Sequence, residues 1–123
     1  MKILLLALFI ICLFPIQGWA DSLEEEYKLK DMCEKKVKEF FKENYDKTVA
    51  RYQSHYNKKL KMCFILVTET TIWGFYDEIF DVDGKKRYGQ NLFTNNMRRC
   101  SVLEKYCESD KEFEKLIKPY MEK

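Results

Sequence analysis

The sequence predicts one α+β domain: a long N-terminal helix packed on a four- or five-stranded antiparallel sheet, closed by a short C-terminal helix. Three observations predict it. Apolar residues recur at helical spacing over residues 23–44, β-branched and aromatic residues fill much of 48–92, and a short helical pattern begins near residue 110. The apolar stripe of the helix and the half-apolar strands each need the other for burial.

The predicted N-terminal helix spans residues 23–44. Ser22 and Glu25 fit a capping box, in which the serine caps the helix and the glutamate three residues later reaches back. Charged residues fill the gaps between the apolar ones, as expected for a helix with one solvated face. The apolar positions are Tyr27, Cys33, Val37, Phe40, Phe41 and Tyr45.

The predicted sheet begins with a strand over residues 48–56, followed by a turn at 57–59. Residues 62–71 are rich in Ile, Val, Phe and Thr, and both faces of this segment are apolar near its start. A strand that is apolar on both faces is typical of a central position in the sheet.

A hairpin is predicted next. Residues 73–82 and 85–92 flank the dipeptide Asp83-Gly84, which is a strong hairpin signal. A two-residue loop there fixes the register, and one oppositely charged pair and one apolar pair then face each other. These pairs are Asp81 with Lys86 and Ile79 with Tyr88.

The end of the chain predicts a short hairpin and a helix. The hairpin covers residues 98–107, and Ser109 with Glu112 forms a second capping box. The helix begins at about residue 110, and Pro119 is expected to end or kink it. Its apolar positions are Phe113, Leu116, Ile117 and Tyr120.

Residues 1–20 have the layout of a secretory signal peptide that is cleaved after Ala20. Lys2 supplies the positive start, and 12 apolar residues follow without a break over 3–14. Gly18 and Ala20 put small residues at the −3 and −1 positions of the cut. The run is shorter than the roughly 17–25 residues of a membrane-spanning helix. We therefore expect a periplasmic or secreted protein with no stable membrane anchor after cleavage.

Residues 21–123 are predicted to form a single domain. They include 41 apolar residues, which suffice for one small core but not for two. Their 21 Lys and Arg residues nearly balance 20 Asp and Glu residues, so nucleic acid is not an expected partner. Their 16 aromatic residues favour a packed core over disorder.

Four cysteines remain after Cys12 leaves with the signal peptide, and an even number in a short exported chain is typical of two disulfides. We predict that Cys33 pairs with Cys63, because Cys33 lies on the inward stripe of the helix and Cys63 on an apolar strand face. Cys100 is predicted to pair with Cys107, because a tight hairpin brings them together.

Other uses of the cysteines stay open at this point. The alternative pairing is Cys63 with Cys107 and Cys33 with Cys100. In a strict two-residue hairpin, Cys100 and Cys107 would meet at a hydrogen-bonded pair, where a cross-strand disulfide is awkward. The chain has no C-x-x-C, and its only histidine, His55, is far from ligand spacing to any cysteine. We therefore predict no metal site and no cofactor.

A motif over residues 52–64 carries a resemblance. It reads YQSHYNKKL and is followed closely by Cys63-Phe64. Three further features agree: Tyr88-Gly89 in the hairpin, the late cysteine pair, and the ending from Glu112-Phe113 to Lys118-Pro119-Tyr120-Met121. Together they resemble small exported bacterial proteins of unknown function. The resemblance covers most of the chain after residue 20 and implies an envelope or secreted location, but no fold and no activity.

The same segment supplies the candidate binding residues, since tyrosine and arginine combine contact area with hydrogen bonds. The other interpretation is that the tyrosines pack beneath a helix and the lysines are merely solvated. The candidates are Arg51, Tyr52, His55, Tyr56, Lys58 and Lys59.

The sequence predicts no catalytic residue. We therefore predict that the protein is a non-catalytic envelope or secreted binding module. A secreted enzyme inhibitor is a special case, and residues 94–99 are the best candidate for its projecting loop. The alternative is a small exported enzyme with His55 as general base. Strand alternation turns His55 away from Ser54 and Tyr56, so those neighbours would not serve it. The partner is an envelope or extracellular protein or a small ligand, and the oligomeric state is left open.

Overall fold

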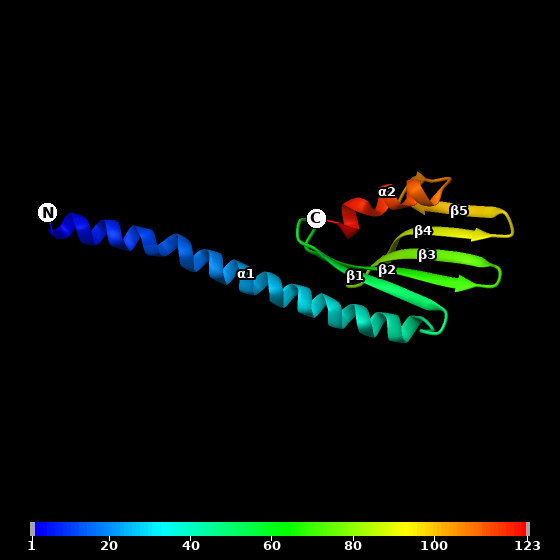
Figure 1. The fold of residues 1–123 in the computed structure, drawn as a ribbon, viewed down its shortest axis with the longest axis horizontal. Coiled ribbons are helices and arrows are strands. Elements are labelled where there is room, and N and C mark those ends of the chain that lie inside the picture. The colour runs from blue at the N-terminus through cyan, green and yellow to red at the C-terminus, as the bar shows by residue number, and fades with distance from the viewer. Residues whose placement is uncertain (1, 123) are drawn as a thin grey trace.

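The computed structural model describes the backbone of residues 2–122 and the side chains of residues 22–122. The predicted signal peptide, 1–20, lies outside the residues whose side chains are described. Within the described part, no helix is both long enough and apolar enough to cross a membrane. The elements (Figure 1) are α1 (Lys2–Asn44), β1 (Ala50–Asn57), β2 (Met62–Thr71), β3 (Gly74–Asp81), β4 (Lys86–Thr94), β5 (Met97–Val102), β6 (Lys105–Tyr106) and α2 (Asp110–Met121).

The strands form one antiparallel sheet in chain order, from β1 at one edge to β6 at the other. The predicted α+β class, with a helix before the sheet and a short helix after it, is confirmed. The described sheet has six strands rather than the four or five predicted. The hairpin predicted over residues 98–107 supplies both β5 and β6, and β6 is only two residues long.

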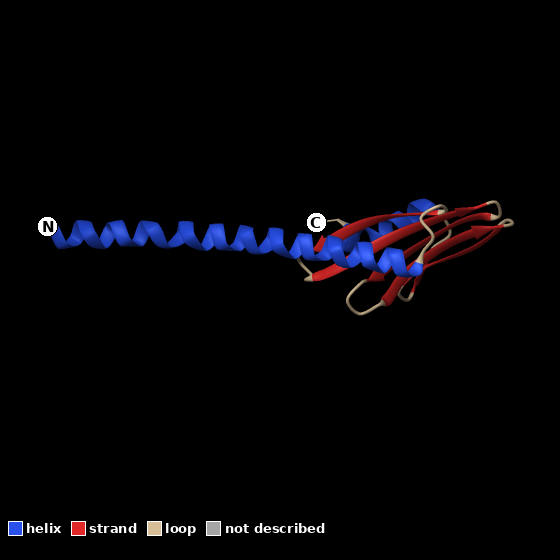
Figure 2. Ribbon diagram, turned by 90° about the horizontal axis from the view of Figure 1, so that it is seen from below, coloured by secondary structure: helices blue, strands red, loops and turns tan. Residues whose placement is uncertain are grey.

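The two helices cover opposite faces of the sheet (Figure 2). Neighbouring residues of a strand point to opposite faces, so Ile65 packs beneath α1 while Phe64 packs against α2. Each face therefore has its own core. The core beneath α1 contains Cys33, Val37, Phe40, Phe41, Ala50, Cys63, Ile65, Val67 and Val82, and the core beneath α2 contains Phe64, Ile79, Cys100, Val102, Cys107, Phe113 and Ile117.

Helix α1 ends at Asn44, as predicted, but it does not begin at Ser22. The helix runs through this residue from Lys2, so Ser22 is an interior helical residue and the capping box does not form in the full chain. The buried stripe also begins later than predicted. Tyr27 is 70% exposed, and burial starts at Cys33, because the sheet ends before it reaches the first turns of the predicted helix.

The β3–β4 hairpin has a four-residue loop, Val82–Lys85, rather than a two-residue one. Asp81 pairs with Lys86, as predicted, but Ile79 pairs with Gly89 and not with Tyr88, because a bulge shifts the register between Ile79 and Phe80. Gly89 suits this position. A Cβ atom on it would lie 3.0 Å from the carbonyl oxygen of Ser101 on the neighbouring strand.

The predicted projecting loop at residues 94–99 is absent from the described structure. Thr94 ends β4 and Met97 begins β5, which leaves only a two-residue turn. Asn95 and Asn96 have φ angles of 48° and 64°. Asparagine tolerates positive φ, and such a turn matches the twist of the strands it joins.

Both predicted disulfides are confirmed. Cys33 of α1 is bonded to Cys63 of β2, with a Cα–Cα distance of 5.5 Å. Cys100 is bonded to Cys107 across the β5–β6 hairpin, with a Cα–Cα distance of 4.9 Å. The second pair lies in a strict two-residue hairpin, the geometry in which we expected a cross-strand disulfide to be unfavourable. Here the Cys107 amide donates a hydrogen bond to the Cys100 carbonyl at 3.0 Å.

Helix α2 begins at its predicted cap. The Ser109 hydroxyl accepts a hydrogen bond from the Glu112 amide at 3.1 Å, and the Glu112 carboxylate accepts one from the Glu108 amide at 2.9 Å. Pro119 does not end the helix, which runs on to Met121. A proline there removes one amide donor close to the helix end, and the following residues keep the helical path.

Candidate binding cleft

A cleft of about 790 Å³ opens between α1 and the end of β1. One wall comes from the first exposed turns of α1 and the other from the last residues of β1 and the turn after it. Figure 1 shows α1 running along β1 and continuing beyond the sheet at this end. The lining residues are Glu26, Lys30, Cys33, Glu34, Ser54, His55, Tyr56, Asn57, Lys58 and Lys59.

The Cys33–Cys63 disulfide fixes the base of the cleft. Cys33 itself lines the cleft and is 3% exposed, and Val37, one turn further along α1, is fully buried. The covalent bond therefore holds the helix against β2 where the cleft begins. From that point back to Ser22, α1 leaves the sheet, and all the side chains of this segment except that of Glu26 are exposed.

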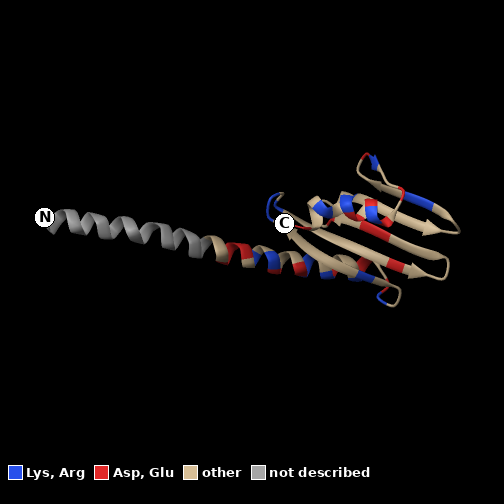
Figure 3. Ribbon diagram, turned by 45° about the horizontal axis from the view of Figure 1, so that its top comes forward, with Lys and Arg blue, Asp and Glu red and all other residues tan. Residues whose placement is uncertain are grey.

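An ion-pair bridge closes one side of the cleft. The Lys58 ammonium donates to one oxygen of Glu26 at 3.1 Å, and the Lys30 ammonium lies 3.3 Å from the other. Hydrogen bonds from Lys58 and then Lys30 lower the pKa of the Glu26 carboxyl below its ordinary value. Such exposed pairs stabilise the fold little. They do place charges of both signs at the rim of the cleft. Figure 3 shows acidic and basic positions following one another along the described part of α1.

Asn57 anchors the wall formed by β1. This residue is 4% exposed, and its side-chain amide donates to the carbonyl oxygens of Pro119 at 2.8 Å and Tyr120 at 3.2 Å. Its side-chain oxygen accepts from the Leu60 amide at 3.0 Å. Carbonyl groups in the last turn of a helix lack hydrogen-bond partners within the helix. Asn57 therefore supplies a donor to two such carbonyls of α2 and at the same time holds the β1–β2 turn.

His55 is half-buried where β1 passes close to the end of α2. Burial lowers the pKa of its imidazole first, the positive charge of Lys30 lowers it further, and a hydrogen bond with the Glu122 backbone opposes both effects. Its Nε2 atom is buried and has no hydrogen-bond partner among the described residues. No carboxylate in the described part of the chain makes a hydrogen bond to the imidazole either, so no acidic group orients the ring.

Four of the six candidate binding residues line the cleft together: His55, Tyr56, Lys58 and Lys59. The other two lie further back on β1. Arg51 and Tyr52 are exposed and line a shallow hollow of about 340 Å³ with residues of β2.

The tyrosines of this set also have a structural role. The Tyr52 ring lies 4.5 Å from the Phe41 ring, measured between centroids, and Tyr56 packs against the core beneath α1. Each of these tyrosines therefore combines a packed ring with a surface that is still accessible.

The sequence did not indicate which residues of α1 would complete the cleft. Glu26, Lys30 and Glu34 look like an ordinary solvated helix face, and only the docking of the helix on β2 brings them to the same place as β1. The helical spacing of Cys33, Glu26 and Lys30 could have suggested that they share a side of the helix.

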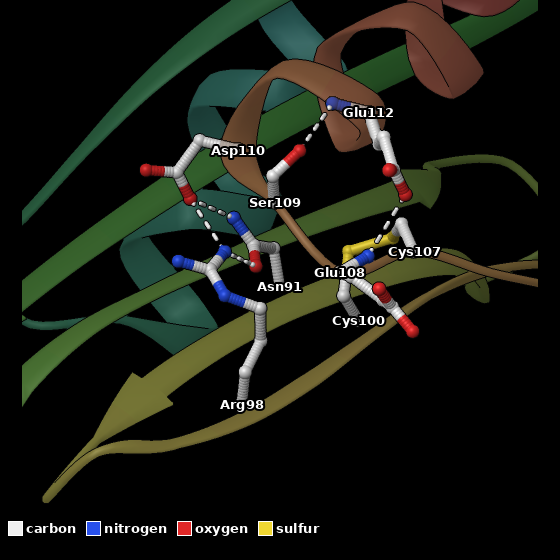
Figure 4. Close-up of polar contacts among 8 residues, drawn as sticks. All are labelled: Asn91, Arg98, Cys100, Cys107, Glu108, Ser109, Asp110 and Glu112. Carbon is white, nitrogen blue, oxygen red and sulfur yellow. Dashed lines mark hydrogen bonds and ion pairs between the residues drawn. A yellow bond between two sulfur atoms is a disulfide. The ribbon is translucent and has the colours of Figure 1, made fainter.

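A second polar cluster, also missed, lies where α2 begins (Figure 4). Asn91 is fully buried, and its amide donates to the Asp110 carboxylate at 2.8 Å. The Arg98 guanidinium donates to Asp110 at 2.7 Å and to the Asn91 oxygen at 2.9 Å. The three residues come from β4, β5 and α2, so no sequence motif contains them. Their mutual hydrogen bonds satisfy one another, which makes the cluster structural.

No group of three His, Cys, Asp or Glu side chains within the described residues is placed to hold a metal ion. Comparisons with protein-family models, with curated proteins and with solved structures found no match to this chain.

Proposed function

We propose that the protein is an exported binding module and that the cleft between α1 and β1 is its contact surface. The observation that carries the proposal is the convergence of His55, Tyr56, Lys58 and Lys59 with the charged rim of α1 around one cleft. The cleft offers ammonium groups, a hydroxyl and a tyrosine ring, which suit recognition of a polar partner. Its base is covalently fixed, so little conformational entropy is lost there on binding.

Export is part of the same proposal. Two disulfides in a short chain and the signal-like layout of residues 1–20 support a periplasmic or secreted location. Cleavage after Ala20 would leave Ser22 near the new N-terminus. Its hydroxyl would then be free to cap α1, the role that the capping box predicts but that the full-length helix does not use.

The alternative function, an enzyme with His55 as general base, draws on the presence of His55, Glu26 and Glu34 in one cleft. A general base must reach the proton that it removes. The buried Nε2 atom and the ion pairs that occupy Glu26 weigh against this role. We therefore favour binding without catalysis.

The test is capture of a partner from envelope extract by the oxidised protein. The variant Lys58→Ala/Lys59→Ala removes two ammonium groups from the cleft, and Lys85→Ala/Lys86→Ala removes two exposed ones from the β3–β4 hairpin as a matched control. A partner retained in stoichiometric amount by the wild type and the control, but lost with the cleft variant, supports the proposal. Equal capture by all three proteins overturns it.

His55→Gln separates the two functions in the same assay. A binding module gains nothing from this substitution, so its capture of the partner stays equal to or falls below that of the wild type, since His55 lines the cleft. An enzyme without its base would instead retain a substrate that the wild type releases as product. Increased capture by His55→Gln therefore favours the enzyme.

A further inference from the structure

The two edges of the sheet differ sharply. One edge is β6, only two residues long, and such a short edge offers little to pair with. The other edge is β1, whose eight residues run without a proline or a bulge against β2. Proteins usually shorten, charge, bend or cover an exposed edge to prevent pairing. An unbroken edge of this length is therefore a surface ready to accept another strand.

The register of β1 shows which of its backbone groups are available. The Thr70 amide donates to the Val49 carbonyl at 2.9 Å, and in an antiparallel pair such bonds recur at every second residue. Residues 51, 53, 55 and 57 therefore use their amide and carbonyl groups on β2. The corresponding groups of Tyr52, Ser54 and Tyr56 point outward, away from the sheet. Ala50 is occupied, because its amide donates to the Asp46 carbonyl at 3.0 Å.

The middle of β1 is open to solvent. Residues 51–54 are all exposed, although α1 packs over one face of β1 and the Phe41 ring contacts Tyr52 there. Three hollows follow one another along the strand: about 510 Å³ around residues 47–51, about 340 Å³ around residues 51–53, and the 790 Å³ cleft around residues 54–59. Residues of β2 also line the first two and residues of α1 the third, so these hollows can receive side chains that reach over β1 from a segment added beside it.

The charge of this edge indicates which kind of peptide segment it would bind. Lys47, Arg51, Lys58 and Lys59 each line one of the hollows, and Figure 3 shows basic positions at both ends of β1. Glu34 is the one cleft carboxylate with no ion pair in the described structure. A second copy of β1 would bring only further basic residues to this edge, because residues 47–61 contain no Asp or Glu. Like charges oppose that pairing, whereas carboxylates on an added strand would favour it.

We propose that β1 binds an extended acidic peptide segment of another protein as a seventh strand of the sheet. The proposal rests on the proposed function and names the kind of partner. Backbone hydrogen bonds to Tyr52, Ser54 and Tyr56 supply affinity without regard to sequence, and the basic residues along the edge supply the preference for acidic segments.

The probe is a displayed library of random ten-residue peptides, selected on the oxidised protein expressed from its full sequence. We expect enriched peptides to carry net negative charge. The most enriched peptide is then synthesised with single N-methyl groups along its backbone. Methylation at every second amide should abolish binding, and methylation between those positions should leave it unchanged. Uniform tolerance of N-methylation, or enrichment without acidic residues, overturns the proposal.

A protein variant tests the same contact from the other side. Ser54→Pro removes an amide that points outward. We expect the hydrogen bonds between β1 and β2 to be kept, because proline is tolerated on edge strands where its nitrogen faces solvent. Ser54→Ala keeps the amide and is the matched control. Ser54→Pro should bind the selected peptide at least about tenfold more weakly than Ser54→Ala does, which isolates the loss of the amide from the loss of the hydroxyl.

The outcomes separate this proposal from the proposed function. A peptide that depends on Lys58 and Lys59 but binds Ser54→Pro normally overturns strand addition and leaves the cleft as the contact surface. A peptide that depends on Ser54 but not on the two lysines overturns the cleft. A wild-type dimer in sedimentation that Ser54→Pro converts to a monomer shows that a second copy occupies the edge, and this also overturns the proposal.

Discussion

The Arg98 guanidinium and the Asp110 carboxylate meet at 2.7 Å and join the fifth strand of the sheet to the first turn of the last helix. Asp110 sits at the N-terminal end of α2, where a negative charge is favourable. Asn91 completes the contact by donating to Asp110 and accepting from Arg98. The start of α2 is thus held to the sheet by charge, while its middle is held by Phe113 and Ile117 in the core.

Loss of the Asn91 side chain should destabilise the fold. Asn91→Ala removes a fully buried amide and leaves Arg98 and the exposed Asp110 with one hydrogen-bond partner fewer each, and we expect the free energy of unfolding to fall by about 1–3 kcal/mol. Urea denaturation measures this. The control is Gln53→Ala, an exposed amide on β1, which should change stability by less than about 0.5 kcal/mol. Equal effects of the two substitutions would show that the hydrogen bonds of Asn91 contribute no more to stability than an exposed amide does.

The Asp110 contact should make stability depend on pH. Hydrogen bonds from Arg98 and then Asn91 lower the pKa of the Asp110 carboxyl in the folded protein. Its contribution is therefore present above the unfolded pKa of about 4 and is lost as pH falls through the folded value. The urea midpoints of the wild type and Asp110→Asn should differ at pH 7 and converge towards pH 3. A constant difference across this range would contradict the assignment.

The two disulfides should differ in their contribution. The Cys33–Cys63 bond closes a loop with a sequence separation of 30, and the Cys100–Cys107 bond one with a separation of 7. Chain entropy gives about 3.7 and about 2.5 kcal/mol, respectively, at 25 °C. Replacing each pair by serines and comparing unfolding free energies tests the order. A larger loss from the hairpin pair would mean that packing, not loop closure, governs the difference.

The connectivity itself has a chemical test. Cys33→Ser should free the Cys63 thiol alone and leave Cys100 and Cys107 bonded. Peptide mapping without reduction, after alkylation of free thiols, identifies the free cysteine. A free thiol at Cys100 or Cys107 in this variant would contradict the pairing.

The register of β1 predicts opposite results for prolines at adjacent positions. Gln53 faces Leu66 at a pair that is hydrogen-bonded in this register, so Gln53→Pro should remove a ladder bond and cost about 2–3 kcal/mol. Ser54→Pro should cost less than about 1 kcal/mol, because the Ser54 amide faces outward. Thermal or urea unfolding of both variants decides this. If Ser54→Pro cost more stability than Gln53→Pro, the hydrogen-bonding register of β1 against β2 would be shifted by one residue.

Processing after Ala20 remains a prediction of the sequence. The intact mass of the protein recovered outside the cytoplasm should correspond to a chain that begins at Asp21. In that chain Ser22→Ala should remove the new helix cap and cost about 1 kcal/mol. A mass that includes residues 1–20, or an added acyl group on Cys12, would contradict cleavage.

Local patterns predicted local structure well. The bounds of β2, the end of α1 at Asn44 and the cap of α2 at Ser109 all follow from alternation, periodicity and capping residues close in sequence. The Ile79 pairing was missed because a bulge shifts the register before Gly89, where β5 lies close, and nothing in the hairpin sequence marks that bulge.

The cleft was only half predictable. The residues of β1 and its turn are contiguous in sequence, so their composition already marked them. The opposite wall depends on where α1 crosses the sheet, and that crossing is set by the Cys33–Cys63 bond and the apolar contacts around Val37. Whether a solvated residue such as Glu26 faces another element cannot be read from the helix alone.

The bond from Asn57 to the Pro119 carbonyl joins residues 62 positions apart. It has a consequence for how the chain matures. The ribosome delivers the N-terminal part first, so β1 and its turn emerge well before the residues of α2 that hold them. Until the last helix is released, the Asn57 amide lacks its acceptors and the cleft lacks its anchored wall. Assembly of the cleft is therefore a late event, and a nascent chain truncated before residue 119 should expose an unfinished edge strand to quality-control proteases.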